Sequence, residues 1–266
     1  MLLSRFFSNA TVGMFALVTP LAAETTSNHA ETPETGFISY GDDLNSDRWY
    51  ISKYNNEASW LDTVWTRDAV EYDPKDGALV LSLSPAPSST GKSYQGGEVQ
   101  LRQQTSFGRY EVIMTAAPGD GVVSSFFTYT GPHFETPHDE IDFEFLGRNT
   151  TEVWLTAFVE GEKKPGQAVD LGFDATEGPH LYAFDWQPDS LTWYVDGREL
   201  LHVTTEDAPI PSLPQKIFIN IWVGGEGQHD WTGAAAANTR SSARYYCISY
   251  RPPGADTPQC SNWSPQ

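Results

Sequence analysis

The sequence is poor in cations relative to acids. Its 266 residues contain 16 Lys and Arg against 35 Asp and Glu, a formal net charge of −19 at pH 7. This shortage argues against nucleic acid and anionic membrane as partners, because both need cations to neutralise phosphates. A neutral polysaccharide fits better, although charge alone reports on solubility rather than on substrate.

Cysteine is also scarce, with only Cys247 and Cys260 in the chain. In an oxidising compartment we expect the two thiols to bond to each other and close a short C-terminal loop. The alternative is a metal site, which would need more ligands than two thiols supply.

Long apolar runs are absent, which bears on the N-terminus. The run at 12–21 is too short to span a bilayer and contains Pro20. Residues 1–23 are therefore predicted to be a secretory signal peptide with cleavage near Ala23, the alternative being a membrane anchor. Residues 24–35 are polar without an apolar period, which predicts a disordered leader. We expect a secreted or periplasmic protein.

Heptads, internal repeats and linkers are missing as well, whereas short strand patterns follow one another with turns between them. Around ten such strands predict an all-β fold, a jelly-roll sandwich over residues 36–250 with alternate faces serving core and cleft. Residues 251–266 form the predicted tail. Asp196 and Gly197, between two strand patterns, predict a hairpin. Further patterns lie at 78–83, 97–102, 107–115, 121–129, 152–159, 180–186, 191–195, 216–223 and 243–250.

The most informative stretch is HDEIDFEFLG at residues 138–147. Its acids, Glu140, Asp142 and Glu144, alternate with Ile141, Phe143 and Phe145. A period of two sends the acids to one face of a strand and the apolar side chains to the other. A solvated edge strand is the alternative, but it would gain nothing from three like charges on one face. Environments that raise carboxylate pKa values are commonly built for acid/base chemistry, so a catalytic strand is favoured.

The spacing of Glu140 and Glu144 suggests which chemistry. Residues i and i+4 of a strand lie about 13 Å apart at Cα. Two Glu side chains leaning toward each other shorten this to roughly 5–6 Å between carboxyl groups, which suits a retaining glycosidase rather than an inverting one. The pattern predicts a nucleophile and a general acid/base on one strand.

Together with GVVSSFFTYTGP, HLYAFDWQPDSLTWYVDG and KIFINIW, this stretch resembles glycoside hydrolase family 16, particularly its lichenase-type members that cut mixed β-1,3-1,4-glucan. The likeness covers residues 45–250. It implies two curved antiparallel sheets with an open concave substrate cleft, and no cofactor. It also implies that Glu140 is the nucleophile, Glu144 the acid/base and Asp142 the residue that tunes the pair.

The motif also discriminates within the family. One residue separates Asp142 from Glu144, as in lichenase-like and xyloglucan-active members, whereas laminarinase- and agarase-like members typically carry an extra residue that makes a bulge. The resemblance thus points to a β-1,4-containing glucan.

Further positions match the family's cleft residues one by one. Asn220 and Trp222 lie two apart on one strand face, where Asn can bond a hydroxyl and Trp can stack on a pyranose ring. For Glu98 the alternative is a surface charge on a strand, and for the aromatic residues the alternative is packing in the core. The predicted substrate-binding residues are Glu98, Phe127, Tyr129, His138, Asn220, Trp222 and Trp231.

Departures from the lichenase pattern concern His138, Trp154, Thr156 and Tyr246. His138 stands where lichenase-like members usually have Trp. With this His, the stretch is similar to that of plant xyloglucan endotransglycosylase/hydrolases. His138 either contacts Glu140 or a sugar, or pairs with Asp139 or Glu135. Trp154 and Thr156 occupy positions of the following strand that carry polar sugar-binding residues in lichenases. Tyr246 replaces an Asp used for structural calcium, so the sequence does not support a calcium site, although backbone oxygens could bind the ion.

The sequence therefore predicts a secreted, monomeric, retaining endo-β-glucanase whose partner is a polysaccharide, with mixed-linkage glucan or a related exopolysaccharide as substrate. Two alternatives stay open. A transglycosylase would use the same carboxylates and pass the sugar to a hydroxyl instead of water. A non-catalytic carbohydrate-binding protein could share the fold.

Overall fold

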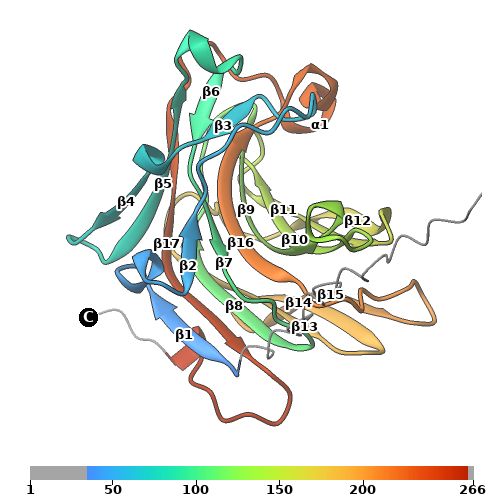
Figure 1. The fold of residues 1–266 in the computed structure, drawn as a ribbon. Helices are drawn as coiled ribbons and strands as arrows, with labels where there is room; N and C mark the ends of the chain where they lie inside the picture. The colour runs from blue at the N-terminus through green and yellow to red at the C-terminus, as the bar shows by residue number, and fades with distance from the viewer. Residues whose placement is uncertain (1–34, 263–266) are drawn as a thin grey trace, which may run out of the picture. The chain divides into compact units, whose positions relative to one another are not determined.

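The computed structural model describes residues 35–262. The predicted signal peptide and nearly all of the predicted leader lie outside the described residues. Two large β-sheets make up the described chain, and Figure 1 shows the smaller one as a curved layer against the larger. The predicted all-β fold is confirmed.

The smaller sheet has seven strands, and the acidic stretch forms β10 near one of its edges. In spatial order the strands are β12 (Glu162–Asp170), β11 (Glu152–Val159), β10 (Asp139–Leu146), β9 (Val122–Thr130), β16 (Lys216–Val223), β7 (Glu98–Leu101) and β2 (Trp49–Ile51).

The larger sheet has ten strands and backs the first. Its main path is β15 (Arg198–Thr204), β14 (Ser190–Val195), β13 (His180–Trp186), β8 (Gly108–Thr115), β17 (Ser241–Arg251), β5 (Ala78–Pro85), β6 (Tyr94–Gly96) and β3 (Thr63–Trp65), with β1 (Phe37–Tyr40) paired to β17 and β4 (Val70–Asp73) to β5. The described strands pair antiparallel, except for the parallel pair β3 and β6.

Helical structure is short. One α-helix, α1 (His229–Thr232), follows β16, and single 3₁₀ turns occur elsewhere. None of the helices between residues 35 and 262 is long and apolar enough to cross a membrane. The 3₁₀ turns are Asp43–Asn45, Arg67–Ala69, Ser88–Thr90, Pro132–Phe134, Glu226–Gln228 and Cys260–Asn262.

Aromatic side chains fill the space between the sheets. Phe143 and Phe145 of β10 pack on Tyr182 of β13, with ring centroids 5.7 and 4.7 Å apart, and all three rings are buried. Burying one such side chain contributes roughly 1.5–3 kcal/mol. The apolar half of the 138–147 pattern therefore fixes β10 to the core.

Buried hydrogen bonds tie the two sheets together behind the acids. The Trp193 indole of β14 donates to the carbonyl of Asp142 at 3.1 Å. The Tyr245 hydroxyl of β17 lies 2.9 Å from the carbonyl of Ser125 and 3.1 Å from that of Asn220. These side chains hold the backbones of β10, β9 and β16, because a buried carbonyl without a partner costs free energy.

Several predicted elements match the structure closely. The patterns at 180–186 and 216–223 coincide with β13 and β16. The hairpin is confirmed, since Val195 pairs with Arg198 while Asp196 and Gly197 both have positive φ, at 49° and 80°. The estimate of around ten strands was too low, because edge strands such as β12 and short ones such as β3 lack a clear apolar alternation.

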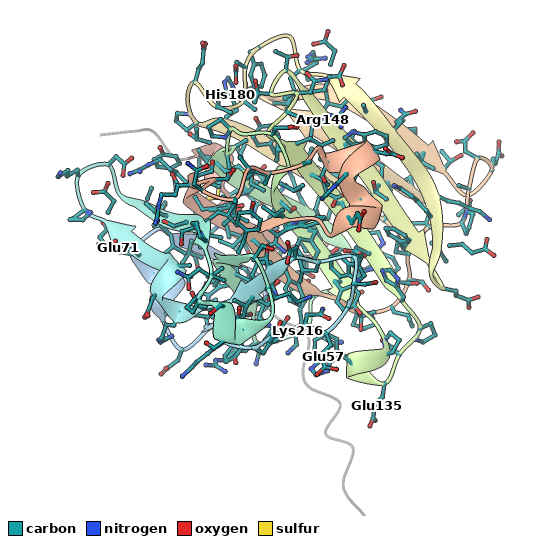
Figure 2. The ribbon with its side chains drawn as sticks, turned by 90° about the horizontal axis from the view of Figure 1, so that it is seen from above. Glu57, Glu71, Glu135, Arg148, His180 and Lys216 are labelled. Carbon is teal, nitrogen blue, oxygen red and sulfur yellow. A yellow bond between two sulfur atoms is a disulfide. The ribbon has the colours of Figure 1, made fainter. Side chains whose placement is uncertain are left out.

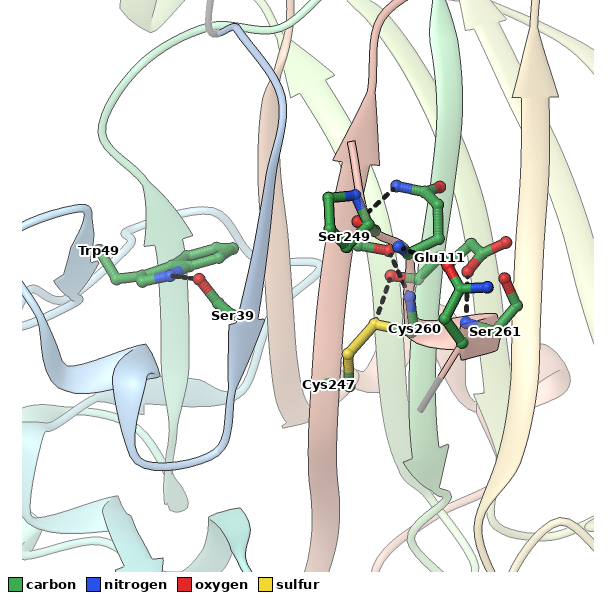
Figure 3. Close-up of a disulfide and its surroundings, with 10 residues drawn as sticks. Ser39, Trp49, Glu111, Cys247, Ser249, Cys260 and Ser261 are labelled. Carbon is green, nitrogen blue, oxygen red and sulfur yellow. Dashed lines mark hydrogen bonds between the residues drawn. A yellow bond between two sulfur atoms is a disulfide. The ribbon is translucent and has the colours of Figure 1, made fainter. Parts of the chain in front are cut away.

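The predicted disulfide forms between Cys247 of β17 and Cys260 (Figure 3). Two hydrogen bonds fasten the same segment: the Cys260 amide donates to the Ser249 hydroxyl at 3.0 Å, and the Ser261 amide to a carboxyl oxygen of Glu111 at 2.8 Å. Glu111 is buried and also accepts from Arg109 at 2.6 Å. The tail is thus anchored to the larger sheet, away from β10.

Removing this disulfide should lower stability without touching the acids. The bond closes a loop with a sequence separation of 13, for which loop entropy predicts about 3 kcal/mol. Urea unfolding of the Cys247→Ser/Cys260→Ser variant should show that loss, and reduction of the wild type should reproduce it. Equal unfolding midpoints would contradict this account of the tail.

Candidate active site

The outward side chains of β10 and its neighbours form one surface, here called the acidic face. Antiparallel register places Glu144 between Ser125 of β9 and Trp154 of β11. Asp142 lies between Phe127 and Thr156 in the next row. Side chains directly opposite one another in an antiparallel pair share a face and lie in contact range.

Glu140 occupies the third row, between Tyr129 and Phe158. Its carboxyl lies 2.6 Å from Nε2 of His138, and the His138 ring stacks on Phe158 with centroids 4.7 Å apart. The Tyr129 ring also contacts the imidazole, tilted by 60° with centroids 5.3 Å apart. Of the two expectations for His138, the structure brings about the contact with Glu140, not pairing with Asp139 or Glu135.

The three acids differ in environment. Burial, and then the charge of Glu140, raise the pKa of Glu144 to about 8, against a smaller opposing effect from Lys163. Burial and repulsion from Glu140 and Glu144 raise the pKa of Asp142 well above its usual range. The Glu140 side chain retains 18% of its exposure. The strand thus carries two carboxyls whose neutral forms are favoured by their surroundings, next to the partly exposed Glu140.

Glu98 is enclosed by hydrogen-bond donors. Its carboxyl accepts from the Ser52 hydroxyl at 2.7 Å, the Tyr54 hydroxyl at 3.1 Å and the Asn220 amide at 3.4 Å. Only 4% of the residue is exposed, so the alternative of a surface charge is wrong. Burial raises its pKa despite these bonds. Ser52 and Tyr54 were not predicted, because their contact with Glu98 links distant parts of the chain.

Four tryptophans form a connected cluster beside the Glu144 row. Trp222 contacts Trp60 at 5.7 Å and Trp231 at 6.1 Å between ring centroids, and Trp231 contacts Trp154 at 5.9 Å. Trp222 is 6% exposed and packs with Leu61 and other apolar side chains, whereas Trp60 is 46% exposed. Trp60 and the half-buried Trp154 and Trp231 therefore offer more accessible indole surface than Trp222.

A pocket of about 200 Å³ adjoins this cluster, with Trp154, Trp231, Asn149 and Glu152 among its lining residues. Arg148 closes it toward α1, where its guanidinium donates to the Asp230 carbonyl at 3.2 Å. Figure 2 shows Arg148 beside this helix. The bond fastens the segment that carries Trp231 to the end of β10.

Phe127 and Tyr129 are placed on the acidic face as expected. Phe127 stacks on Phe218 of β16 at 5.0 Å, and Tyr129 meets the same ring edge-on at 6.0 Å. Phe218 and Phe158 belong to this aromatic surface too but were not predicted. The signal available for both was period-two alternation, which needed the strand register to be interpreted.

Several polar atoms of the acidic face lack a partner within the protein. They include Oδ2 of Asp142, Oγ of Ser125, Oγ1 of Thr156 and Oδ1 of Asn220. Buried polar groups are normally paired with protein, water or ligand. The arrangement therefore suits a hydroxyl-rich ligand. Within residues 35–262, no group of three or more His, Cys, Asp or Glu side chains is arranged to hold a metal ion.

A curved β-sandwich with paired carboxylates and indoles on one face is the architecture of a glycoside hydrolase. Residues 57–243 match the model for glycosyl hydrolases family 16. The chain belongs to this family.

Its relatives carry related activities in their names. A β-glucanase of Bacillus amyloliquefaciens is 38% identical over 87% of this chain and 93% of that protein. A xylanase/β-glucanase of Ruminococcus flavefaciens is 40% identical over 80% of this chain, which spans only 26% of that longer protein. A crystal structure of a lichenase from a mouse hindgut metagenome superposes with a TM-score of 0.77 at 38% identity, over 82% of this chain and 100% of that one.

The position of β10 depends on Asp139, which gives a testable prediction. This carboxyl, 1% exposed, accepts from the amides of Glu160 at 3.0 Å, Ser212 at 2.9 Å and Leu213 at 3.2 Å. Asp139→Ala leaves three donors unpaired and should cost roughly 2–4 kcal/mol of unfolding free energy. Hydrogen exchange should quicken at those three amides.

Asp170→Ala is the matched control, because Asp170 is exposed and accepts from the Gly172 amide. Its cost should stay within about 1 kcal/mol. Equal costs for the two variants would show that Asp139 does not hold the start of β10.

Proposed function

We propose that this chain is a secreted, retaining endo-β-glucanase that cuts mixed-linkage β-1,3-1,4-glucan or a related β-1,4-containing glucan. The observation that carries the proposal is the pair Glu140 and Glu144 on one face of β10, with the pKa of Glu144 at about 8. The β-glucanase and lichenase relatives support the choice of polymer.

Glu140 acts as the nucleophile. It is more accessible than the buried Asp142, and its contact with His138 fixes the direction of one carboxyl oxygen. Its carboxylate attacks the anomeric carbon, and the bond from that carbon to the leaving oxygen breaks as the new ester bond forms.

Glu144 acts first as general acid and then as general base. At neutral pH it holds the proton that the leaving oxygen needs, because burial and the charge of Glu140 favour its neutral form. Once Glu140 is esterified its charge is gone, so the pKa of Glu144 falls. The resulting carboxylate takes a proton from water as the water attacks the glycosyl-enzyme.

Asp142 supports the pair from the row between them. Burial and the charges of Glu140 and Glu144 raise its pKa, which favours the neutral carboxyl, a form that can donate a hydrogen bond and adds no third charge. Ionising all three acids in a partly buried site would cost several kcal/mol for each added charge.

Sugar rings bind along the same face. Glu98 holds the Asn220 amide, we assign the Asn220 Oδ1, which has no partner within the protein, to a sugar hydroxyl, and Trp60, Trp231 and Trp154 offer apolar ring surface to pyranose faces. Neutral polar groups and indoles suit an uncharged glucan.

Cutting inside the polymer is tested by viscosity. The purified protein should lower the viscosity of barley-type β-glucan faster than it releases reducing ends. Glu140→Gln should remove the activity, and Glu144→Gln should lower it by roughly 10²–10⁴-fold. A protein that binds glucan but never cleaves any β-glucan would overturn the proposal, and product masses would separate hydrolysis from transfer.

The pH dependence gives a second test. Because Glu144 must be protonated to act as acid, kcat/KM should fall as pH rises through about 8. The raised pKa of Glu144 places this alkaline limb at a pH well above the pKa of an ordinary Glu. An alkaline limb near pH 5 would show that Glu144 is not the general acid.

A further inference from the structure

Lys163 lies on β12 and reaches the acidic face, although no sequence pattern points to it. It pairs in register with Phe158, which pairs with Glu140, so its backbone continues Glu140's row. Its side chain runs over Gly166, where an added Cβ would lie 2.4 Å from Cε of Lys163. Gly166 therefore provides the space that lets the lysine extend along the sheet.

Two indoles fix the far end of that side chain. The Lys163 ammonium lies 5.4 Å from the ring centroid of Trp154 and 5.8 Å from that of Trp231. A cation within about 6 Å of an aromatic face is attracted to it by the ring quadrupole. Among the described residues no ion pair involves Lys163, which is exposed, so these rings are what hold its charge in place.

Trp154 brings the cation close to the acid/base carboxyl, since Trp154 and Glu144 are partners in register. The other groups on the same face around Glu144 are acidic or uncharged: Glu140 and Asp142 on its own strand, Ser125 on β9, Asn220 on β16 and Glu98 on β7. Glu152 and Asp230 line the pocket next to Trp154. The nearby cation Arg148 is bonded to carbonyls of α1.

We propose that Lys163 is a positioning residue for proton transfer, whose ammonium, fixed over Trp154 and Trp231, stabilises the carboxylate form of Glu144. The inference rests on the proposed function, because it assigns Lys163 a part in the acid/base cycle. Lys163 matters most in the second step, when Glu144 must be ionised to activate water. It opposes the effects of burial and of Glu140, in agreement with its lowering influence on the pKa of Glu144.

The size of the effect follows from Coulomb's law. Lys163 is exposed and lies on β12, separated from β10 by β11, and a unit charge folded back over that strand should shift the titration of a carboxyl by roughly half a pH unit. Losing the cation should leave Glu144 protonated to higher pH. The alkaline limb of kcat/KM should therefore move upward in Lys163→Met, and deglycosylation should slow at neutral pH.

The test titrates Glu144 directly by ¹³C NMR of Glu carboxyl carbons, with the signal assigned by its loss in Glu144→Gln, alongside the pH profile of kcat/KM. In Lys163→Met both midpoints should rise by roughly half a pH unit, and Lys163→Arg should restore them. Lys164→Met is the matched control, because Lys164 pairs with exposed Glu162 at 2.8 Å, and it should leave both midpoints unchanged.

An unchanged NMR midpoint in Lys163→Met overturns the inference, even if KM rises, since a simple sugar contact would alter KM alone. The titration needs no turnover. If the wild type cuts no β-glucan and the midpoint still moves, the proposed function fails while the electrostatic role of Lys163 stands.

Discussion

The alternation along β10 is the constraint on which the rest of the structure depends. Burial of Ile141, Phe143 and Phe145 contributes several kcal/mol in total and fixes the strand, so the acids between them have only one face to occupy. Burial, and then the crowding of like charges on that face, raises the pKa of Asp142 and Glu144. Packing energy on one side of a strand thus sustains unfavourable electrostatics on the other.

Side chains of the larger sheet hold β10 and its neighbours in place. Trp193 and Tyr245 reach through the core to bond backbone carbonyls of β10, β9 and β16, and Asp139 ties the start of β10 to two loops. The disulfide at Cys247 stabilises the sheet behind. Catalytic geometry of this kind needs support from outside the site, because a carboxyl misplaced by 1 Å loses much of its rate advantage.

Much of this was predictable from the sequence. Period-two alternation located β10 and the face of its acids, and the same rule located β13 and β16. What could not be predicted depends on contacts between distant strands. Glu98 was expected in a cleft, but its enclosure by Ser52 and Tyr54 requires register across the sheet. Lys163 was missed because β12 is a polar edge strand, and only the gap at Gly166 brings its ammonium to Trp154.

The most direct test of the central claim is to trap the covalent intermediate. A 2-fluoro-glycoside of a β-glucan oligosaccharide slows both steps, and an activated leaving group such as fluoride keeps the first step fast, so the glycosyl-enzyme should accumulate. Peptide mass mapping should then find one added glycosyl group, esterified to Glu140, in the wild type but not in Glu140→Gln. An adduct on Glu144, or rapid turnover through an inverted product with no adduct, would contradict the assignment of Glu140 as nucleophile.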